Sequence, residues 1–276
     1  MTINCKGQLL DLSTPKVMGI LNVTPDSFYD GGKFKGESDI LNQVEVMLSD
    51  GATFIDIGGY SSRPGAYEVS EDEEIQRTAP ITELIIKHFP ETSISIDTFR
   101  STVAKKNIEA GASLVNDISA GYLDENMLQT VADLRVPYIM MHMRGNPRTM
   151  QSKTDYSDLT VEINRYFSER IAKCQSLQIK DIIIDPGFGF SKTLEQNFQL
   201  LNQLSDLKIC DKPILAGVSR KSMIYKSLDI TPSEALNGTT ALNMVALEHG
   251  ASILRVHDVK EAMECVRLHN QLKGNG

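Results

Sequence analysis

The sequence has no excess of positive charge, no long apolar run and no paired cysteines. Its 276 residues include 28 Lys and Arg against 36 Asp and Glu, which gives a formal charge of -8. Binding to nucleic-acid phosphates would need a basic face, so this balance argues against it. No apolar run approaches the roughly 20 residues that span a bilayer, and no basic segment followed by an apolar one marks the N-terminus. We therefore expect neither a nucleic-acid nor a membrane partner, and no secretory signal.

The four cysteines are scattered and form no Cys-x-x-Cys pair. They are typical of reduced thiols in a cytoplasmic protein, not of a disulfide framework or a zinc site. Hydrophobic residues make up 41% of the chain and charged residues 23%, which is ordinary for a globular protein. Since no shift in composition and no Pro/Gly/Ser-rich linker divides the sequence, we expect one domain over residues 1–276.

Eight short β-branched apolar runs alternate with longer amphipathic stretches. The runs cover residues 17–23, 53–57, 93–97, 113–117, 137–142, 181–185, 213–218 and 252–256. Strands joined by helices run parallel with right-handed crossovers, and eight such units close into a (β/α)₈ TIM barrel. A doubly wound open sheet is the main alternative. Residues 3–12 predict a short β-hairpin before the barrel.

Helix signals lie between these runs. Apolar residues at 159, 163, 167, 171 and 174 follow one face of a helix. Three pairs have the spacing of a capping box at a helix start: Ser70 with Glu73, Thr231 with Glu234, and Asp258 with Glu261. Pro80 lies inside an otherwise helical stretch, which predicts a kink or two shorter helices.

Each expected strand ends at a polar residue. Three glycines, Gly51, Gly111 and Gly250, each follow a helix, and five residues after them stand Asp56, Asn116 and Arg255. The other strand ends carry Asn22, Asp97, His142, Asp185 and Ser219. A single polar residue at a strand end is as often a turn former or a helix cap as it is part of a functional site. Because the chemistry of such barrels lies at the C-terminal ends of the strands, eight together favour a site.

Two loops after the first strands contain several glycines. Residues 22–32 are rich in turn formers, and they form either a simple mobile loop or one that covers a substrate while Asn22 offers a hard oxygen ligand. Residues 56–66 combine glycines, hydroxyls and Arg63. That combination is typical of a phosphate cradle, although the spacing of a P-loop is absent.

Buried carboxylates at a barrel mouth need donors. Asp97, Asn116 and Asp185 would suit a flat heterocycle with adjacent ring N–H and amino groups, and ion pairing with Lys221 or Arg255 is the structural alternative. Lys221, Arg255 and His257 follow the seventh and eighth strands, where barrels often bind phosphate. The alternative is that these three residues are solvated surface charges without a bound anion. The aromatic residues of segment 185–190 suit stacking on a planar ring.

These segments together resemble the dihydropteroate synthases. The resemblance spans about residues 16–260 and rests on NVTPDSFYDGG (22–32), GGYSSRPG (58–65), SIDT (95–98), ND (116–117), MMHMRG (140–145), DPGFGF (185–190), GVSRKS (217–222) and RVHD (255–258). The Asp/Asn set is shared with related pterin-binding barrels, whereas the first-strand and seventh-strand motifs are specific. One departure is Ser62, where the family usually has threonine. Serine keeps the hydroxyl and loses a methyl contact with the second substrate.

The resemblance implies a sulfonamide-targeted transferase of folate biosynthesis. It would condense 6-hydroxymethyl-7,8-dihydropterin diphosphate with 4-aminobenzoate, which gives 7,8-dihydropteroate and diphosphate. It also implies Mg²⁺ on the diphosphate, ligated by Asn22 with Asp30 nearby, a cytoplasmic location and a homodimer. The absence of a Ser-His-Asp or Cys-His constellation agrees with attack of a weak amine on a cation, which needs no strong base.

The resemblance also assigns roles to individual residues. The pterin would be held by Asp97, Asn116, Ile118, Met140, Asp185, Phe190, Gly217 and Lys221. The diphosphate would be held by Asn22, Ser61, Ser62, Arg63, Arg255 and His257. The 4-aminobenzoate would be framed by Phe28, Ser62, Pro64, Phe190, Lys221 and Ser222. The catalytic set would be Asp97, Asp185, Lys221, Asp30 and Arg63.

Three alternatives differ from this reading. A methyltetrahydrofolate–corrinoid methyltransferase would have no use for Arg63, Arg255 and His257. A non-catalytic pterin-binding paralogue should have lost some of the loop or diphosphate residues. A Schiff-base aldolase would use Lys221, but this lysine follows its strand, and we expect its amine to lie outside the desolvated barrel interior.

Overall fold

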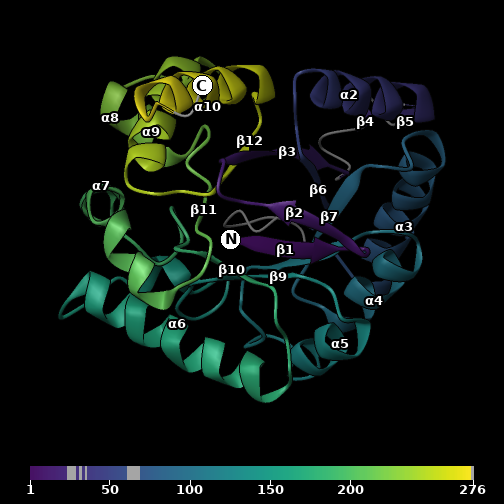
Figure 1. Cartoon of the computed structure of the whole chain (residues 1–276), viewed down its shortest axis with the longest axis horizontal. Coiled ribbons are helices and arrows are strands. Elements are labelled where there is room, and N and C mark those ends of the chain that lie inside the picture. The colour runs from purple at the N-terminus through teal and green to yellow at the C-terminus, as the bar shows by residue number, and fades with distance from the viewer. Residues whose placement is uncertain (24–28, 31–32, 35, 61–68, 275–276) are drawn as a thin grey trace.

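Eight parallel strands form the central sheet of the computed structural model, in the order β10-β9-β8-β7-β6-β3-β12-β11 (Figure 1). The structure describes residues 1–276 except 24–28, 31–32, 35, 61–68 and 275–276. The strands are β3 (Lys16–Asn22), β6 (Phe54–Gly58), β7 (Ser93–Asp97), β8 (Leu114–Asp117), β9 (Tyr138–Met141), β10 (Ile182–Asp185), β11 (Leu215–Ala216) and β12 (Ile253–Val256). All eight expected strands are therefore present.

The sheet closes between its two end strands. Ile184 of β10 forms a parallel bridge with Ile214, which directly precedes β11. Its backbone N–H donates to the Pro213 carbonyl over 2.9 Å, and the Ser252 N–H donates to Ile214 on the other side over 2.8 Å. This closure confirms the barrel and excludes the open doubly wound sheet.

Helices cover the outside of the barrel (Figure 1). They are α2 (Glu37–Ser49), α3 (Glu71–His88), α4 (Ser101–Glu109), α5 (Met127–Leu134), α6 (Leu159–Ser176), α7 (Leu194–Asn202), α8 (Ser222–Leu228), α9 (Leu236–Glu248) and α10 (Val259–Leu272). Short 3₁₀ turns are η1 (Met150–Ser152), η2 (Leu204–Cys210) and η3 (Pro232–Glu234), and two short strands, β4 (Tyr29–Asp30) and β5 (Lys33–Phe34), pair antiparallel. As expected, α6 buries residues 159, 163, 167, 171 and 174.

The N-terminal hairpin closes one end of the barrel. Strands β1 (Thr2–Cys5) and β2 (Gln8–Asp11) pair antiparallel, as the sequence predicted. Ile3, Cys5 and Leu12 pack in one cluster with apolar residues near the starts of the barrel strands, among them Met18 and Phe54. In Figure 1 the hairpin lies across the centre of the barrel. The opposite end, where the strands finish, therefore remains for chemistry.

The glycines that end the helices have the expected left-handed backbone, with φ of 104° at Gly51, 115° at Gly111 and 97° at Gly250. Ser70 caps α3 by accepting a bond from the Glu73 N–H. Thr231 and Glu234 form the predicted capping box.

One helix prediction was wrong, and one alternative of a second is excluded. Asp258 makes no side-chain cap on α10, because its carboxylate is bound by the Arg220 guanidinium over 2.8 and 2.9 Å. Helix α3 runs through Pro80 as one helix, which excludes two shorter helices, while the predicted kink stays a prediction. Pro80 is exposed, so the Gln76 carbonyl that it leaves without an intrahelical partner faces the solvent side.

Candidate active site

Four strand-end residues meet in one hydrogen-bonded cluster at the barrel mouth. Arg255 of β12 donates from Nε to Asp56 Oδ2 and from Nη2 to Asp97 Oδ2, each over 2.6 Å. Asn116 of β8 donates from Nδ2 to Asp56 Oδ2 over 3.2 Å. The parallel register pairs Asp97 with Asn116 at neighbouring strand ends, while Asp56 lies two residues before the end of β6, level with Ser95. The sequence had allowed ion pairing of Asp97 with Arg255, and the structure shows that pair.

The cluster has two carboxylates and one guanidinium. Burial raises the pKa of Asp97 to about 7, Arg255 opposes this effect, and the neighbouring Asp56 charge adds to it. Burial alone would lower the pKa of Arg255, but Asp56 and Asp97 raise it above its ordinary value. Arg255 is therefore a fixed cation, whereas Asp97 can take up a proton near neutral pH.

Asp185 and Lys221 lie on the other side of the mouth. Asp185 is 6% exposed, and its Oδ1 accepts from the Gly187 N–H over 2.8 Å. Burial raises the pKa of Asp185, and Lys221 opposes this shift most strongly. The Lys221 ammonium donates to the Phe188 carbonyl and lies 5.0 Å from the centre of the Phe190 ring. A carboxylate, an ammonium and an aromatic face thus stand side by side.

Gly217 leaves space between the two groups of residues. A Cβ at this position would lie 3.9 Å from both Arg255 Cβ and Lys221 Nζ. Burial lowers the pKa of Lys221 to about 8, with Asp185 opposing the shift. We had expected the Lys221 amine to lie outside the desolvated barrel interior, and this was wrong. The position of Lys221 therefore does not argue against an aldolase.

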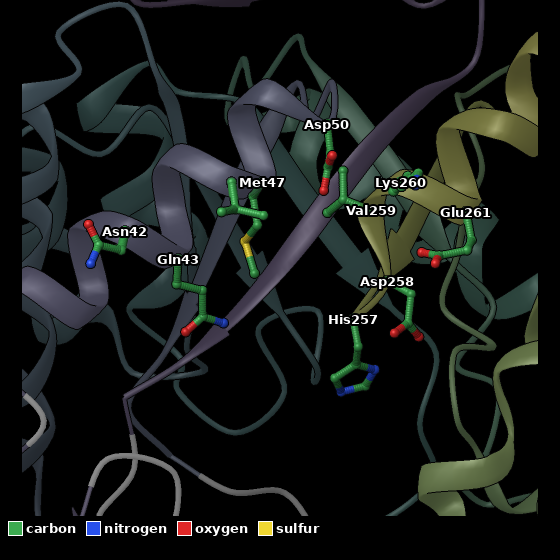
Figure 2. Close-up of a pocket in the computed structure, with 10 residues that line it drawn as sticks. Asn42, Gln43, Met47, Asp50, His257, Asp258, Val259, Lys260 and Glu261 are labelled. Carbon is green, nitrogen blue, oxygen red and sulfur yellow. The ribbon is translucent and has the colours of Figure 1, made fainter.

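His257 and Ser219 pair beside the mouth. The Ser219 hydroxyl lies 2.9 Å from His257 Nδ1 and accepts from the His257 N–H over 3.2 Å. A pocket of about 460 Å³ opens next to His257, between α2 and the start of α10. Figure 2 shows Asn42 and Gln43 on the α2 side of this pocket and Lys260 and Glu261 on the other. Of the diphosphate residues that the structure describes, Asn22, Arg255 and His257, this pocket is lined by His257 alone, and its lining does not include Asp97, Asn116, Asp185 or Lys221.

The remaining assigned residues divide into two groups. Ile118, 7% exposed, packs with Met141 and Phe190 at the mouth, whereas Met140 is fully buried in the barrel core. Ser222 begins α8 directly after Lys221. The side chains of six others lie outside the described residues: Phe28, Asp30, Ser61, Ser62, Arg63 and Pro64. For Asp30 the structure gives only its backbone, in β4.

Sequence reasoning gave no role to two residues that organise the site. Asp56 was identified as a strand-end residue, but it is the carboxylate that joins Arg255 to Asn116. Lys192 was not identified at all, because it lies beyond the aromatic motif and has no characteristic spacing. Its ammonium is buried beneath that motif and contacts His142, Gly187 and Phe190.

The described part of the chain contains no group of three or more His, Cys, Asp or Glu residues that could hold a metal. Within that same part, none of the helices combines the length and the apolar character needed to cross a membrane.

Known protein families and sequences were compared with this chain. The family model for "Pterin binding enzyme" matches residues 18–257. The dihydropteroate synthase of Escherichia coli is 46% identical over 270 residues, covering 97% of this chain and 95% of that protein. The Synechocystis dihydropteroate synthase is 46% identical over 259 residues, covering 93% of this chain and 89% of that protein.

Solved structures give the same result. The Yersinia pestis dihydropteroate synthase in complex with a sulfonamide drug superposes with a TM-score of 0.93 at 43% identity, covering 99% of this chain and 100% of that one. The Xanthomonas albilineans enzyme in complex with 7,8-dihydropteroate has a TM-score of 0.89 at 34% identity, covering 99% of each chain. The chain therefore belongs to the family of pterin-binding enzymes, and its relatives place it among the dihydropteroate synthases. This membership disfavours both the methyltransferase and the aldolase.

Proposed function

We propose that this chain condenses 6-hydroxymethyl-7,8-dihydropterin diphosphate with 4-aminobenzoate to give 7,8-dihydropteroate and diphosphate. The observation that carries the proposal is the meeting of Asp97, Asn116, Asp185 and Lys221 around one mouth, in a chain of this family. The named relatives support it, since one solved neighbour holds 4-aminobenzoic acid and another holds 7,8-dihydropteroate. The whole of residues 1–276 would act as one domain.

The mouth offers the acceptors that a pterin ring requires. A pterin presents adjacent ring N–H and amino donors, which a carboxylate can bind through both oxygens. Asp185, with Asp97 and Asn116, would accept these donors, while Ile118, Met140 and Gly217 would border the ring. The Phe190 ring offers a stacking face, and Lys221 would donate to the acceptor edge of the heterocycle.

The diphosphate would lie toward His257 and the ends of β3 and β12. Gly58 leaves room there, since a Cβ on it would lie 3.7 Å from Asn22 Oδ1 and 3.9 Å from Asp97 Oδ2. Mg²⁺ commonly binds through one or two protein oxygens together with substrate phosphates and water, which fits a single amide ligand such as Asn22. When bound, it would neutralise charge on the leaving diphosphate. Arg255 and His257, with Ser61, Ser62 and Arg63, would hold the phosphates, and Asp30 would lie near the metal.

The residues would act by orientation and charge. The bond between the pterin methylene carbon and the diphosphate oxygen breaks, and its electron pair leaves with the diphosphate. Asp97 and Asp185 would stabilise the methylene cation that remains. The nitrogen of the 4-aminobenzoate, which Phe28, Ser62, Pro64, Phe190, Lys221 and Ser222 would frame, then forms the new C–N bond and gives up its proton to water. Orientation of the two substrates replaces a strong general base.

The test is diphosphate release with both substrates, in Mg²⁺ and in excess chelator. We expect release and dihydropteroate formation only when Mg²⁺ is present. Full activity in chelator would contradict the metal assignment. No activity with saturating substrates and Mg²⁺ would contradict the proposed reaction.

We also propose a cytoplasmic homodimer. The four cysteines are all free, which agrees with a reducing compartment. The dimer rests on what is usual in the family. Sedimentation analysis of the purified chain tests the dimer, and cell fractionation tests the location.

A further inference from the structure

Lys192 is a buried lysine beneath the pterin side of the mouth. It is 4% exposed and follows the turn that runs from Asp185 to Phe190. Its Nζ donates to the Gly187 carbonyl and to the Phe190 carbonyl, each over 3.0 Å, and lies 3.1 Å from His142 Nδ1. The ammonium therefore has three partners for its three N–H groups, and two of them belong to that one turn.

The turn has a backbone that needs such support. Gly187 and Gly189 have φ of 72° and 82°, and Ser191, which is not a glycine, has φ of 45°. Gly187 lies so close to the next strand that a Cβ on it would be 2.2 Å from the His142 carbonyl oxygen. Glycine adopts such φ values without steric cost, but the left-handed backbone of Ser191 persists only where its surroundings hold it in place.

Two lysines hold the carbonyls of this turn. Lys192 binds those of Gly187 and Phe190, and Lys221 binds that of Phe188. The N–H groups of the turn are bound as well, since Gly187 donates to Asp185 and Gly189 donates to Asn197 Oδ1 over 2.6 Å. Lys192 thus couples the carboxylate at one end of the turn to the aromatic ring at the other.

His142 supplies the third acceptor. Its side chain is 2% exposed and its ring packs edge-on against Tyr166, with 4.8 Å between ring centres. Burial lowers the pKa of His142 well below its ordinary value, and the positive charges of Lys192 and Arg144 add to this effect. The ring is therefore neutral. With its proton on Nε2, its Nδ1 accepts from the ammonium.

We propose that Lys192, with His142 as its acceptor, is a positioning residue for pterin binding, which sets the 185–190 turn so that the Asp185 carboxylate and the Phe190 ring face the substrate. This inference rests on the pterin pocket proposed above. It gives Lys192 no contact with the substrate. The alternative is that Lys192 only stabilises the fold and that the mouth keeps its geometry without it.

The two possibilities differ in what they change. A stabilising residue lowers the melting temperature, while the protein that remains folded binds pterin as before. A positioning residue lowers the affinity of the folded protein, because small displacements of binding groups are costly. Affinity measured well below the melting temperature therefore separates them.

The experiment is calorimetric titration of 6-hydroxymethylpterin into the full chain and into Lys192→Met. Methionine keeps an unbranched side chain that is one atom shorter and removes all three donors. We expect the affinity of the variant to fall about tenfold or more. Lys173→Met is the matched control, because Lys173 is an exposed lysine on α6, and its affinity should equal that of the unmodified chain.

A milder variant covers the case in which Lys192→Met does not fold. His142→Phe keeps a ring next to Tyr166 and removes both ring nitrogens, including the Nδ1 acceptor of Lys192, so we expect a loss of about threefold with both carbonyl bonds retained. In the unmodified chain, nitrogen NMR of His142 should show a neutral ring with the proton on Nε2.

The outcomes are distinct. Unchanged pterin affinity in a folded Lys192→Met variant overturns the positioning role, and so does unchanged affinity in His142→Phe if the first variant is unfolded. Asp185→Asn separates this result from failure of the pocket itself. If pterin binds the unmodified chain and Asp185→Asn weakens it, the pocket stands and only the role of Lys192 is decided.

Discussion

Replacing Arg255 with methionine tests whether one guanidinium holds the two carboxylates of the mouth together. Arg255 binds Asp56 and Asp97, each over 2.6 Å. Its side chain is 20% exposed, that of Asp56 is 0% exposed and that of Asp97 is 24% exposed. In Arg255→Met the two carboxylates would lose their shared cation while they remain largely out of water.

The expected cost follows from this burial. Removing one partner of a buried ion pair costs about 3–5 kcal/mol, and the partial exposure of Arg255 favours the lower end, about 3 kcal/mol of unfolding free energy. Removal of Arg255 also removes the charge that lowers the pKa of Asp97, so this pKa should rise above its present value of about 7. An acid whose pKa is raised in the folded state loses stability as pH rises through that pKa. The cost should therefore be larger at pH 9 than at pH 6.

The assay is urea unfolding followed by circular dichroism, since the chain has no tryptophan. Arg220→Met is the matched control, because Arg220 also binds an aspartate, Asp258, through two bonds, but at the edge of the mouth. The side chains of Arg220 and Asp258 are 24% and 18% exposed, and only one carboxylate loses its cation there, whereas Arg255→Met leaves two and one of them, Asp56, is fully buried. The control variant should therefore lose less. The double variant Asp56→Asn, Arg255→Met removes one of the two stranded carboxylates and should recover about 1–2 kcal/mol.

Three results would refute the reasoning. The first is an Arg255→Met variant that loses no more than Arg220→Met at pH 9. The second is a cost that does not change between pH 6 and pH 9. The third is a double variant that is no more stable than Arg255→Met. That result would show that the unpaired Asp56 carboxylate does not destabilise the Arg255→Met variant.

Two further variants test the other side of the mouth. Gly187→Ala should reduce the unfolding free energy by about 2 kcal/mol or more, because the φ of Gly187 is 72° and the new Cβ would lie 2.2 Å from the His142 carbonyl oxygen. Gly36→Ala is the control for the same urea titration, because no described atom lies within 4 Å of a Cβ there. Equal midpoints for the two variants would contradict the account. Asp185→Asn should weaken pterin binding by about 1–3 kcal/mol in calorimetry, because an NH₂ donor would face the donors of the ring. Asp181→Asn, before the start of β10, is the control and should have no effect. An unchanged affinity in Asp185→Asn would remove Asp185 from the pocket.

The sequence predicted the strands and the barrel well because both depend on local periodicity. Every expected strand formed, and Asp97 and Asn116 lie together because parallel strands finish at the same edge. Asp56, expected at a strand end, lies two residues before the end of β6 and reaches Asn116 and Arg255 from there. The hairpin followed from its short alternating pattern. These features need only the spacing of residues along the chain.

The choice of partners was not predictable in the same way. Arg255 binds carboxylates that are 199 and 158 residues away, and Asp258 gives up its helix cap to bind Arg220. Lysine is usually an exposed residue, so the sequence gives no reason to expect Lys192 to be buried. Its role follows only from the folded structure, in which the 185–190 turn lies over its ammonium. Such pairings depend on which side chains the closed barrel brings within hydrogen-bond distance. The spacing of residues along the sequence does not give these distances between residues that are far apart in the chain.

The charges around the described part of the mouth explain why the proposed reaction should depend on Mg²⁺. Asp56, Asp97 and Asp185 stand against Arg255 and Lys221, with Lys192 below, and burial lowers the pKa of Lys192 to about 7 and that of Lys221 to about 8. Burial also raises the pKa of Asp97 to about 7 and raises that of Asp185, so burial weakens the charge of both sets, and the three carboxylates face three cations before any substrate binds. A diphosphate adds several negative charges that Arg255, already shared by two carboxylates, does not offset. The additional positive charge must come from elsewhere, and Mg²⁺ at Asn22, together with Arg63, is the source that the proposed site provides.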